Sequence, residues 1–343
     1  MALVAGVTAL AAAIGLSILL LGLQRVFASA PTLWDSNDRD ITDTSLSVVI
    51  PAFDEEQNIE GCLTHVLMSE RPCSRWDVIV VDDQSSDNTV KIAEQAIVAV
   101  AGADQPDATV LQAGPRPKGE RWVGKNWGCC QAMEQVNSEW VLFIDADVTL
   151  APDAIRRALH QSINENADLF SLAPRLTCGC LAEWMVQPIM ASLLGLGFPI
   201  LEANDPASTV AFAAGPFMLF RRDSYNAIGG HRALAGEVVE DLALARRIKE
   251  GGFRLRYVLG IDAVDLQMYA NLQALWEGWS KNWFLGLDRS ISKSLGAGGV
   301  VLLMFTLPWL LLPASLTMAC LSSQDQILWL SDAGLGLIAI LMQ

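Results

Sequence analysis

Residues 140–148 read WVLFIDADV, an apolar run that ends in two aspartates. Such a run predicts a buried strand, which places Asp145 and Asp147 at its carboxyl end. Side chains two residues apart on an extended chain point to the same side, so the two carboxylates can converge on one hard cation. A cation held by one or two carboxylates together with substrate phosphates is typical of Mg2+ or Mn2+ at a diphosphate.

Two earlier segments have the same design. Residues 46–53 (LSVVIPAF) and 77–83 (DVIVVDD) predict strands, and each is followed by a polar turn and by apolar residues at helical spacing. Alternating strands and helices predict a parallel sheet, and ligands bind at the carboxyl ends of its strands. The carboxylates at the three strand ends are Asp54, Glu55, Glu56, Asp82, Asp83, Asp145 and Asp147. A single acidic pair would more often be a turn or a helix cap, but three sets predict a nucleotide-diphosphate pocket.

Residues 119–126 (GERWVGKN) nearly match the phosphate-binding loop G-x-x-x-x-G-K-[ST]. Asn126 replaces the hydroxyl residue that would hold magnesium, and no clear strand leads into Gly119. We therefore do not expect an ATP or GTP loop of this type, although Lys125 can direct its charge at a phosphate of another donor.

A later segment, residues 236–255 (GEVVEDLALARRIKEGGFRL), predicts a helix that is opened by Glu240 and Asp241. The helix dipole alone favours acidic residues in a first turn. The alternative is a general base, because a carboxylate near the donor can remove a proton from an attacking hydroxyl. Upstream, His231 lies beside a Gly-Gly turn, where a structural role is favoured over a catalytic one.

Both ends of the chain are apolar. Residues 1–24 contain no charged side chain and are long enough to span a bilayer. A cleaved secretory signal is the alternative, but the absence of a basic amino-terminal region and the presence of Pro31 favour a retained anchor. The blocks 298–321 and 327–342, joined by the polar loop 322–326, predict a hairpin that crosses the membrane twice. The last block has no polar tail, so a continuation beyond Gln343 stays open.

Basic residues flank these spans on the side of the central region, and the loop 322–326 has none. The flanking residues are Arg25, Arg39, Lys281, Arg289 and Lys293. The positive-inside rule then predicts a multi-pass protein of the cell membrane with a cytoplasmic central region. Residues 181–201 and the helically spaced Trp276, Trp279 and Trp283 predict interfacial helices, with ordinary core packing as the alternative.

The composition narrows the function further. The 343 residues are 52% hydrophobic and carry 23 basic against 38 acidic side chains, a net charge of -15. Such a chain is not disordered, and it has no basic surplus with which to bind nucleic acid. The seven cysteines have irregular spacings that fit neither zinc nor redox motifs, so we expect mostly buried thiols in a reducing compartment.

Five segments in this order and spacing resemble the family 2 glycosyltransferases of the GT-A fold, over residues 46–262. They are VVIPAFDEEQNI, VIVVDDQSSDNT, GKNWGCCQA, LFIDADV and EVVEDLALARRIKEGGF. Residues 122–127 (WVGKNW) and 275–284 (LWEGWSKNWF), followed by the hairpin, resemble the membrane-anchored members that glycosylate hopanoids and carotenoids. The resemblance implies an α/β, Rossmann-like GT-A fold with a mixed, mainly parallel sheet flanked by helices, plus transmembrane helices at both ends.

The resemblance also implies roles for single residues. Pro51, Phe53 and Glu55 would line the nucleotide of a UDP- or GDP-sugar, and Asp83 would recognise its base. Asp145 and Asp147 would form the D-x-D pair, with Asp147 in direct contact with Mg2+ or Mn2+. Asp241, paired with Glu240, matches the catalytic base of an inverting transfer to a lipid hydroxyl.

The chain departs from the processive polysaccharide synthases, since Gln267 is followed by Met268-Tyr269-Ala270-Asn271 and not by the Q-x-x-R-W pattern. We therefore expect transfer of one sugar. Lipid-type relatives often carry Arg where this chain has Gln267. A contact to a donor phosphate or to the acceptor is therefore either missing in this chain or supplied by another residue. A processive synthase and a catalytically silent nucleotide-sugar-binding membrane protein stay as alternatives. The sugar, the donor nucleotide, the acceptor lipid and the oligomeric state are not predicted.

The expected domain organisation follows from these segments. It is an anchor at 1–27, a linker at 28–45, the GT-A domain at 46–262, interfacial amphipathic helices at 263–296 and the membrane hairpin at 297–343.

Overall fold

A computed structural model describes residues 1–35, 42–102, 105–197, 199–287, 289–322 and 324–343. The chain divides into an α/β unit, residues 29–191 and 197–275, and a helical unit, residues 1–28, 192–196 and 276–343. Part of the predicted linker, including Arg39, lies outside the described residues.

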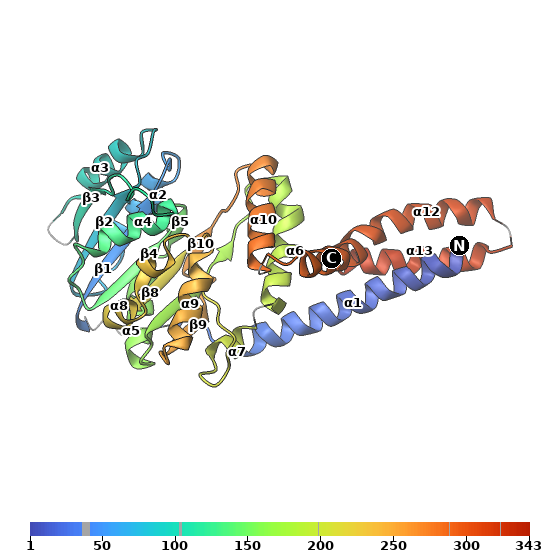
Figure 1. Cartoon of the computed structure of the whole chain (residues 1–343). Helices are drawn as coiled ribbons and strands as arrows, with labels where there is room; N and C mark the ends of the chain where they lie inside the picture. The colour runs from blue at the N-terminus through green and yellow to red at the C-terminus, as the bar shows by residue number, and fades with distance from the viewer. Residues whose placement is uncertain (36–41, 103–104, 198, 288, 323) are drawn as a thin grey trace. The chain divides into compact units, whose positions relative to one another are not determined.

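The α/β unit is built on a seven-stranded sheet with the order β3-β2-β1-β4-β8-β6-β9 (Figure 1). In that order the strands are Asp107–Gln112, Cys73–Asp82, Thr42–Ala52, Trp140–Ile144, Phe217–Arg221, Leu169–Ala173 and Leu255–Leu259. Strand β8 runs antiparallel to β4 and to β6, and the other neighbouring pairs are parallel. The predicted mixed, mainly parallel sheet is confirmed, and the three predicted strands are β1, β2 and β4.

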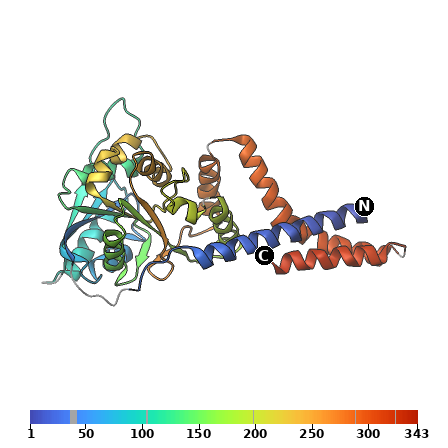
Figure 2. The ribbon, with the colours of Figure 1, turned by 90° about the horizontal axis from the view of Figure 1, so that it is seen from below.

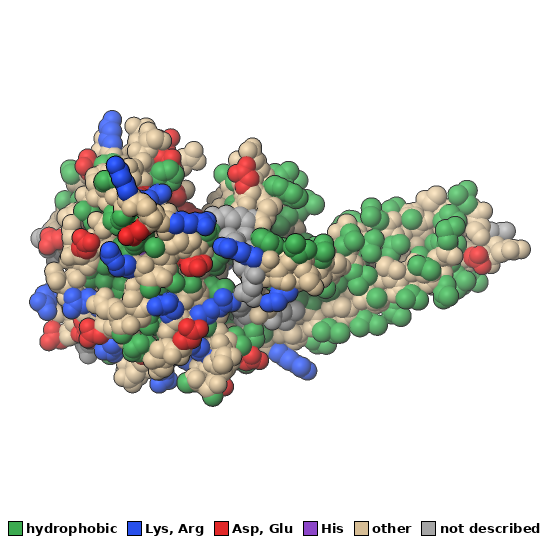
Figure 3. Space-filling model, in the orientation of Figure 1, with side chains coloured by type: hydrophobic (Ala, Val, Ile, Leu, Met, Phe, Trp, Pro, Cys, Tyr) green, Lys and Arg blue, Asp and Glu red, His purple; other side chains and the backbone are tan. Residues whose placement is uncertain are grey.

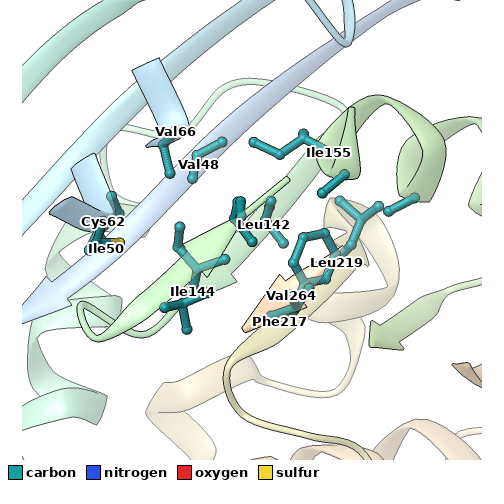
Figure 4. Packing of buried hydrophobic residues seen from close by; sticks show 14 of the residues in the cluster. Val48, Ile50, Cys62, Val66, Leu142, Ile144, Ile155, Phe217, Leu219 and Val264 are labelled. Atoms are coloured by element: carbon teal, nitrogen blue, oxygen red, sulfur yellow. The ribbon is translucent and has the colours of Figure 1, made fainter. Parts of the chain in front are cut away.

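Helices cover both faces of this sheet. They are α2 (Ile59–Leu67), α3 (Thr89–Val100), α4 (Gly124–Met133), α5 (Ala154–Asn164), α8 (Arg222–Ala227) and α9 (Glu240–Glu250). Val48 and Ile50 of β1 pack into one core with α2 and α5, as Figure 4 shows, whereas Val49 belongs to the core on the opposite face. Two covered faces explain why the strands are continuous apolar runs without alternation.

A three-stranded sheet with the order β5-β10-β7 completes the α/β unit. Its strands, in this order, are Val148–Leu150, Val264–Leu266 and Arg175–Leu176. Along the chain, a short helix α7 (Ile200–Asn204) lies between α6 and β8, and a 3-10 turn η1 (Gly230–Leu234) lies between α8 and α9. Strand β5 follows β4 after the Asp145–Asp147 turn, so this turn is held between two strands.

Helix α6 (Leu181–Gly197) begins in the α/β unit and continues through Pro188. The usual burial pattern is reversed in this helix: the charged Glu183 is fully buried, whereas the apolar Leu181, Trp184 and Met185 are exposed. Glu183 accepts hydrogen bonds from the backbone N–H groups of Gly179 and Tyr269, both at 2.9 Å. The buried carboxylate therefore joins two loops, and apolar side chains are left on the surface.

The helical unit contains α1 (Ala2–Ser29), most of α10 (Leu272–Gly286), α11 (Ile291–Val301), a π-helical turn η2 (Leu302–Thr306), α12 (Leu307–Leu321) and α13 (Gln326–Leu341). Helices α12 and α13 form the predicted hairpin, and α1 packs against the turn η2 and α13 through Ala12, Leu16, Met304 and Ala339 (Figures 1 and 2). Residues Ala2–Ser29 and Ile291–Leu321 form two helices that are long and apolar enough to cross a membrane.

The two units differ in the side chains on their surfaces. In Figure 3, hydrophobic side chains cover the visible face of α1, α12 and α13, whereas the α/β unit carries lysine, arginine, aspartate and glutamate there. Among the exposed side chains of the helical unit are Leu310, Leu321 and Ile327.

Candidate active site

A cavity of 290 Å³ lies at the carboxyl ends of β1, β2 and β4. It brings together all seven residues that were predicted to hold the nucleotide and the metal: Pro51, Phe53, Glu55, Asp83, Lys125, Asp145 and Asp147. The parallel register explains this convergence, since Ala52 of β1 pairs with Asp82 of β2, and Val49 of β1 pairs with Phe143 of β4. Three strand ends therefore reach the same edge of the sheet.

Three other predicted carboxylates stabilise the loops around the cavity and do not line it. Asp54 accepts a hydrogen bond from the N–H of Ser86 at 2.7 Å, Glu56 accepts one from the N–H of Asn88 at 3.2 Å, and Asp82 accepts one from the N–H of Gln84 at 3.1 Å. Asp54 and Gln84 have positive φ angles of 54° and 66°, so these tight turns need local partners.

Asp83 lines the cavity and is 4% exposed. Its Oδ2 forms an ion pair with Arg116, while its buried Oδ1 has no hydrogen-bond partner among the described residues. Gly124 faces this pair, and a Cβ there would collide with Asp83 Oδ2 and lie 2.8 Å from Arg116 Nη2. Sequence reasoning missed Arg116; the available signal was a cation in the loop that follows the neighbouring strand β3.

Lys125 lies at the start of α4 and joins two groups of acids. Its Nζ is 2.6 Å from Asp145 Oδ1 and 2.6 Å from Glu240 Oε1. Burial lowers the pKa of Lys125, but the two carboxylates outweigh burial and hold that pKa well above its usual value. The ammonium group thus carries its charge between the cavity and the helix α9.

Asp147 is a buried acid of the cavity lining whose charge is not fully compensated. Its buried Oδ1 lacks a hydrogen-bond partner within the part of the chain that the structure describes. Burial, and then the negative charges of Asp145 and Glu55, raise its pKa to about 7. An orphaned buried carboxylate oxygen is the feature expected of a cation ligand.

The donor set fits Mg2+ or Mn2+ when a diphosphate is also present. The described residues contain no cluster of three or more His, Cys, Asp or Glu side chains that could hold a metal alone. Asp145 and Asp147 supply two carboxylates, and these cations commonly take their remaining ligands from substrate phosphates and water.

Asp241 opens α9 beside Glu240 and lies outside the cavity lining. Its Oδ2 accepts a hydrogen bond from the N–H of Gly215 at 3.2 Å, and its Oδ1 accepts one from the N–H of Leu242 at 2.7 Å. Burial, and then the charge of Glu240, raise the pKa of Asp241 to about 7. A carboxylate with this pKa is suited to take a proton near neutral pH.

Two polar residues near these acids have structural roles. His231 is buried, its Nδ1 is 2.7 Å from Tyr225 Oη, and burial lowers its pKa to about 3, so it stays neutral. Asn126 donates hydrogen bonds from Nδ2 to the carbonyls of Leu234 and Glu237, at 2.6 and 2.9 Å, and so anchors the approach to α9. The Asn in the P-loop-like segment therefore has a packing reason, and β3 ends at Gln112, well before Gly119.

The seven cysteines differ in burial. All seven cysteines are free thiols, but only Cys62, Cys73 and Cys129 are buried, so the expectation that most of them are buried is wrong. A second cavity, of 560 Å³, lies near the start of β1, β2 and β3 and contains none of the predicted site residues. Its position is the opposite edge from the one where open α/β sheets bind ligands.

A solved structure shares the fold of this chain. A mannosyltransferase from Pyrobaculum calidifontis in complex with GDP-Man and Mn2+ superposes with a TM-score of 0.55 at 18% identity, over 97% of each chain. The chain is therefore an α/β protein of the GT-A-like class, as the resemblance implied.

Sequence comparison makes the class specific. The Glycosyl transferase family 2 profile matches residues 47–229, and the chain belongs to this family. It is 28% identical to 4,4'-diaponeurosporenoate glycosyltransferases of Staphylococcus aureus, including those of strains bovine RF122 / ET3-1 and USA300, over 264 residues. These residues are 76% of this chain and 66% of the relatives, so the match spans just under two thirds of their length.

Proposed function

We propose that this protein is an inverting glycosyltransferase that moves a single sugar from a nucleotide-diphosphate sugar to a hydroxyl of a polyisoprenoid-derived lipid. The reaction takes place at the cytoplasmic face of the cell membrane, with Asp241 as the general base. The observation that carries the proposal is the continuous set Asp145–Lys125–Glu240, with two 2.6 Å ion pairs, which joins the cavity to the helix that bears Asp241.

The donor is held at the carboxyl edge of the sheet. Pro51 and Phe53 line the nucleotide, and Asp83, oriented by Arg116, recognises the base through its free Oδ1. Lys125 directs its charge at the diphosphate, and Asp145 and Asp147 would hold Mg2+ or Mn2+. A metal bound there supplies positive charge that stabilises the departing nucleoside diphosphate.

The transfer itself is a single displacement. Asp241 takes the proton of the acceptor hydroxyl, and the oxygen attacks the anomeric carbon. The bond from that carbon to the diphosphate oxygen breaks, and its electron pair leaves with the nucleoside diphosphate. The configuration inverts, and no covalent intermediate between sugar and protein forms.

Three observations support a lipid acceptor. The curated relatives are named as acting on 4,4'-diaponeurosporenoate. Two helices are long and apolar enough to cross a membrane, and α6 leaves Leu181, Trp184 and Met185 exposed. An apolar helix face near charged residues is typical of a segment at a bilayer surface. The basic residues Arg25, Arg289 and Lys293 beside the apolar segments support a cytoplasmic α/β unit.

The test is transfer by the detergent-purified protein with UDP- and GDP-sugars, Mg2+ or Mn2+, and a total lipid extract of the source cells. We expect one donor to yield a metal-dependent glycolipid. Asp241→Asn should keep nucleotide binding, measured by calorimetry, and lose turnover, whereas the exposed Asp223→Asn serves as the matched control.

Other outcomes would contradict the proposal. Full activity of Asp241→Asn would remove it as the base. Long glycan products from one donor would indicate a processive synthase. Nucleotide-sugar binding without transfer or hydrolysis would indicate a catalytically silent binding protein.

A further inference from the structure

The segment that approaches Asp241 from α7 to β8, residues 205–215, is held at both ends. At one end, Lys249 of α9 directs its Nζ at four backbone carbonyls. These belong to Glu202, Asp205, Ser208 and Val210, at 3.2, 2.9, 3.1 and 2.7 Å. Because Lys249 and Asp241 lie on the same helix, the segment is tied to the element that carries the proposed base.

At the other end, Ser171 of β6 holds both backbone polar groups of a single residue, Ala214. Its Oγ donates to the carbonyl of Ala214 at 3.1 Å and accepts from the N–H of Ala214 at 2.8 Å. Ser171 is fully buried. The ladder between β6 and β8 pairs Ser171 with Met218, so Ala214 lies before the start of β8 at Phe217. The hydroxyl therefore satisfies two buried backbone groups just beyond the strand pairing.

The residue that follows Ala214 contacts the base directly. Gly215 donates its N–H to Asp241 Oδ2 at 3.2 Å, and a Cβ at Gly215 would lie 3.3 Å from the same oxygen. The close approach thus favours glycine. The Ala214 carbonyl and the Gly215 N–H belong to one planar peptide unit, so holding the carbonyl also fixes the direction of this N–H.

We propose that Ser171 is a positioning residue for Asp241, which holds the Gly215 N–H against the carboxylate and so aims the carboxylate at the acceptor hydroxyl. The inference rests on the proposed role of Asp241 as the general base. Ser171 does not line the cavity, and it acts through Ala214 and Gly215.

A second buried serine offers a matched control. Ser162 is also fully buried and donates to the carbonyl of Ala158 at 2.6 Å, within α5, which contributes no residue to the cavity lining. Ser162→Ala therefore removes one buried hydroxyl without touching the path to Asp241.

The experiment compares Ser171→Ala, Ser171→Cys and Ser162→Ala in the full-length protein. We expect Ser171→Ala to lower kcat by about tenfold, with the donor KM changed less than about twofold, because only the proton acceptor is disordered. Ser171→Cys should lie between Ser171→Ala and wild type, since a thiol is a weak donor and acceptor. Ser162→Ala should keep wild-type kinetics.

Two further readouts separate positioning from general damage. The acid limb of the pH–rate profile should move to higher pH in Ser171→Ala, because the carboxylate loses the support of an N–H donor. Glu240, Lys125 and Tyr257 also act on Asp241 electrostatically, but they are the same in all variants. Amide hydrogen exchange in residues 205–215 should accelerate in Ser171→Ala only.

An unchanged kcat and pH profile in Ser171→Ala would overturn the inference, as would equal losses in Ser162→Ala. Exchange is measured independently of turnover. A wild type that transfers no sugar from any donor would overturn the proposed function, and with it the role of Ser171 toward a base. Faster exchange in Ser171→Ala alone would then still show that Ser171 restrains residues 205–215.

Discussion

The cavity of the α/β unit and the core of the helical unit both bury carboxylate oxygens that lack a hydrogen-bond partner among the described residues. In the cavity these are Asp83 Oδ1 and Asp147 Oδ1, and in the helical unit it is Asp332 Oδ2. The surroundings differ. Asp147 shares its cavity with Asp145, Glu55 and Lys125, whereas Asp332 of α13 lies against Gly6 of α1.

This difference separates two reasons for burying a charge. In the cavity, the oxygens without a partner belong to residues that line an open space, and we propose that a bound cation and nucleotide offset the cost of burying them. In the helical unit the carboxyl group is packed between helices, and the glycine opposite it allows a close approach of two backbones. We propose that polar groups of the first kind bind ligands, whereas those of the second kind contribute to helix packing.

The largest effect should follow from Asp147→Asn. Removing the orphaned carboxylate should lower turnover by at least about 10³-fold, because the departing diphosphate loses its metal support. Mn2+ binding in the presence of nucleoside diphosphate, measured by electron paramagnetic resonance, should weaken in parallel. Asp223→Asn, exposed and outside the cavity, should behave as wild type. If Mn2+ binding is unaltered in Asp147→Asn, Asp147 does not serve a cation, and the distinction between the two kinds of buried acid is wrong.

Lys125→Met tests whether charge in the cavity serves the ligand. The variant removes the partner of Asp145 and Glu240 and the charge expected at the diphosphate. Binding of UDP or GDP in Mn2+ should weaken about 10- to 100-fold, the size expected for one or two charge-assisted contacts. Calorimetry gives the affinity, and the exposed Lys118→Met is the control. An affinity equal to that of wild type would assign Lys125 to structure alone.

The sequence predicts the cavity better than its supports. Asp145, Asp147 and Asp83 follow apolar strands directly, so strand periodicity and parallel order suffice to bring them together. Asp54, Glu56 and Asp82 fit the same pattern but accept hydrogen bonds from loop backbone, which depends on turn geometry that no spacing rule gives.

Contacts between segments that are distant in the chain are harder to predict from the sequence. The pair Asp83–Arg116 and the donation from Gly215 to Asp241 connect loops whose paths are set by packing. In the helical unit, composition predicts apolar helices at both ends, but neither the π-helical turn η2 nor the contact of Gly6 with Asp332 follows from composition. Long apolar runs predict an apolar environment for a helix, but they do not predict which residues of neighbouring helices meet.

Gly6→Leu should destabilise the helical unit without affecting the cavity. A Cβ at Gly6 would collide with the Asp332 carboxyl group, so the helices must separate. We expect a loss of about 1–3 kcal/mol, typical of overpacking, read as a lower melting temperature in detergent by tryptophan fluorescence. Nucleotide affinity should stay at the wild-type value. The control is Gly334→Leu, whose Cβ would meet no described atom within 4 Å. Equal melting temperatures of the two variants would contradict the packing role of Gly6.

The smallest effect concerns pH. Burial raises the pKa values of Asp147 and Asp241 from 3.8 to about 7, so the folded protein binds more protons than the unfolded chain between these values. The stability of the protein without ligand should therefore fall as pH rises from about 4 to 7 and then level off. Asp147→Asn should flatten this slope when thermal unfolding is followed from pH 5 to 8. Mn2+ with nucleoside diphosphate should restore the lost stability at pH 8, because the ligands bind only the folded, ionised site. If stability instead rises over this range, these acids are compensated in the ligand-free protein, and the contrast with Asp332 disappears.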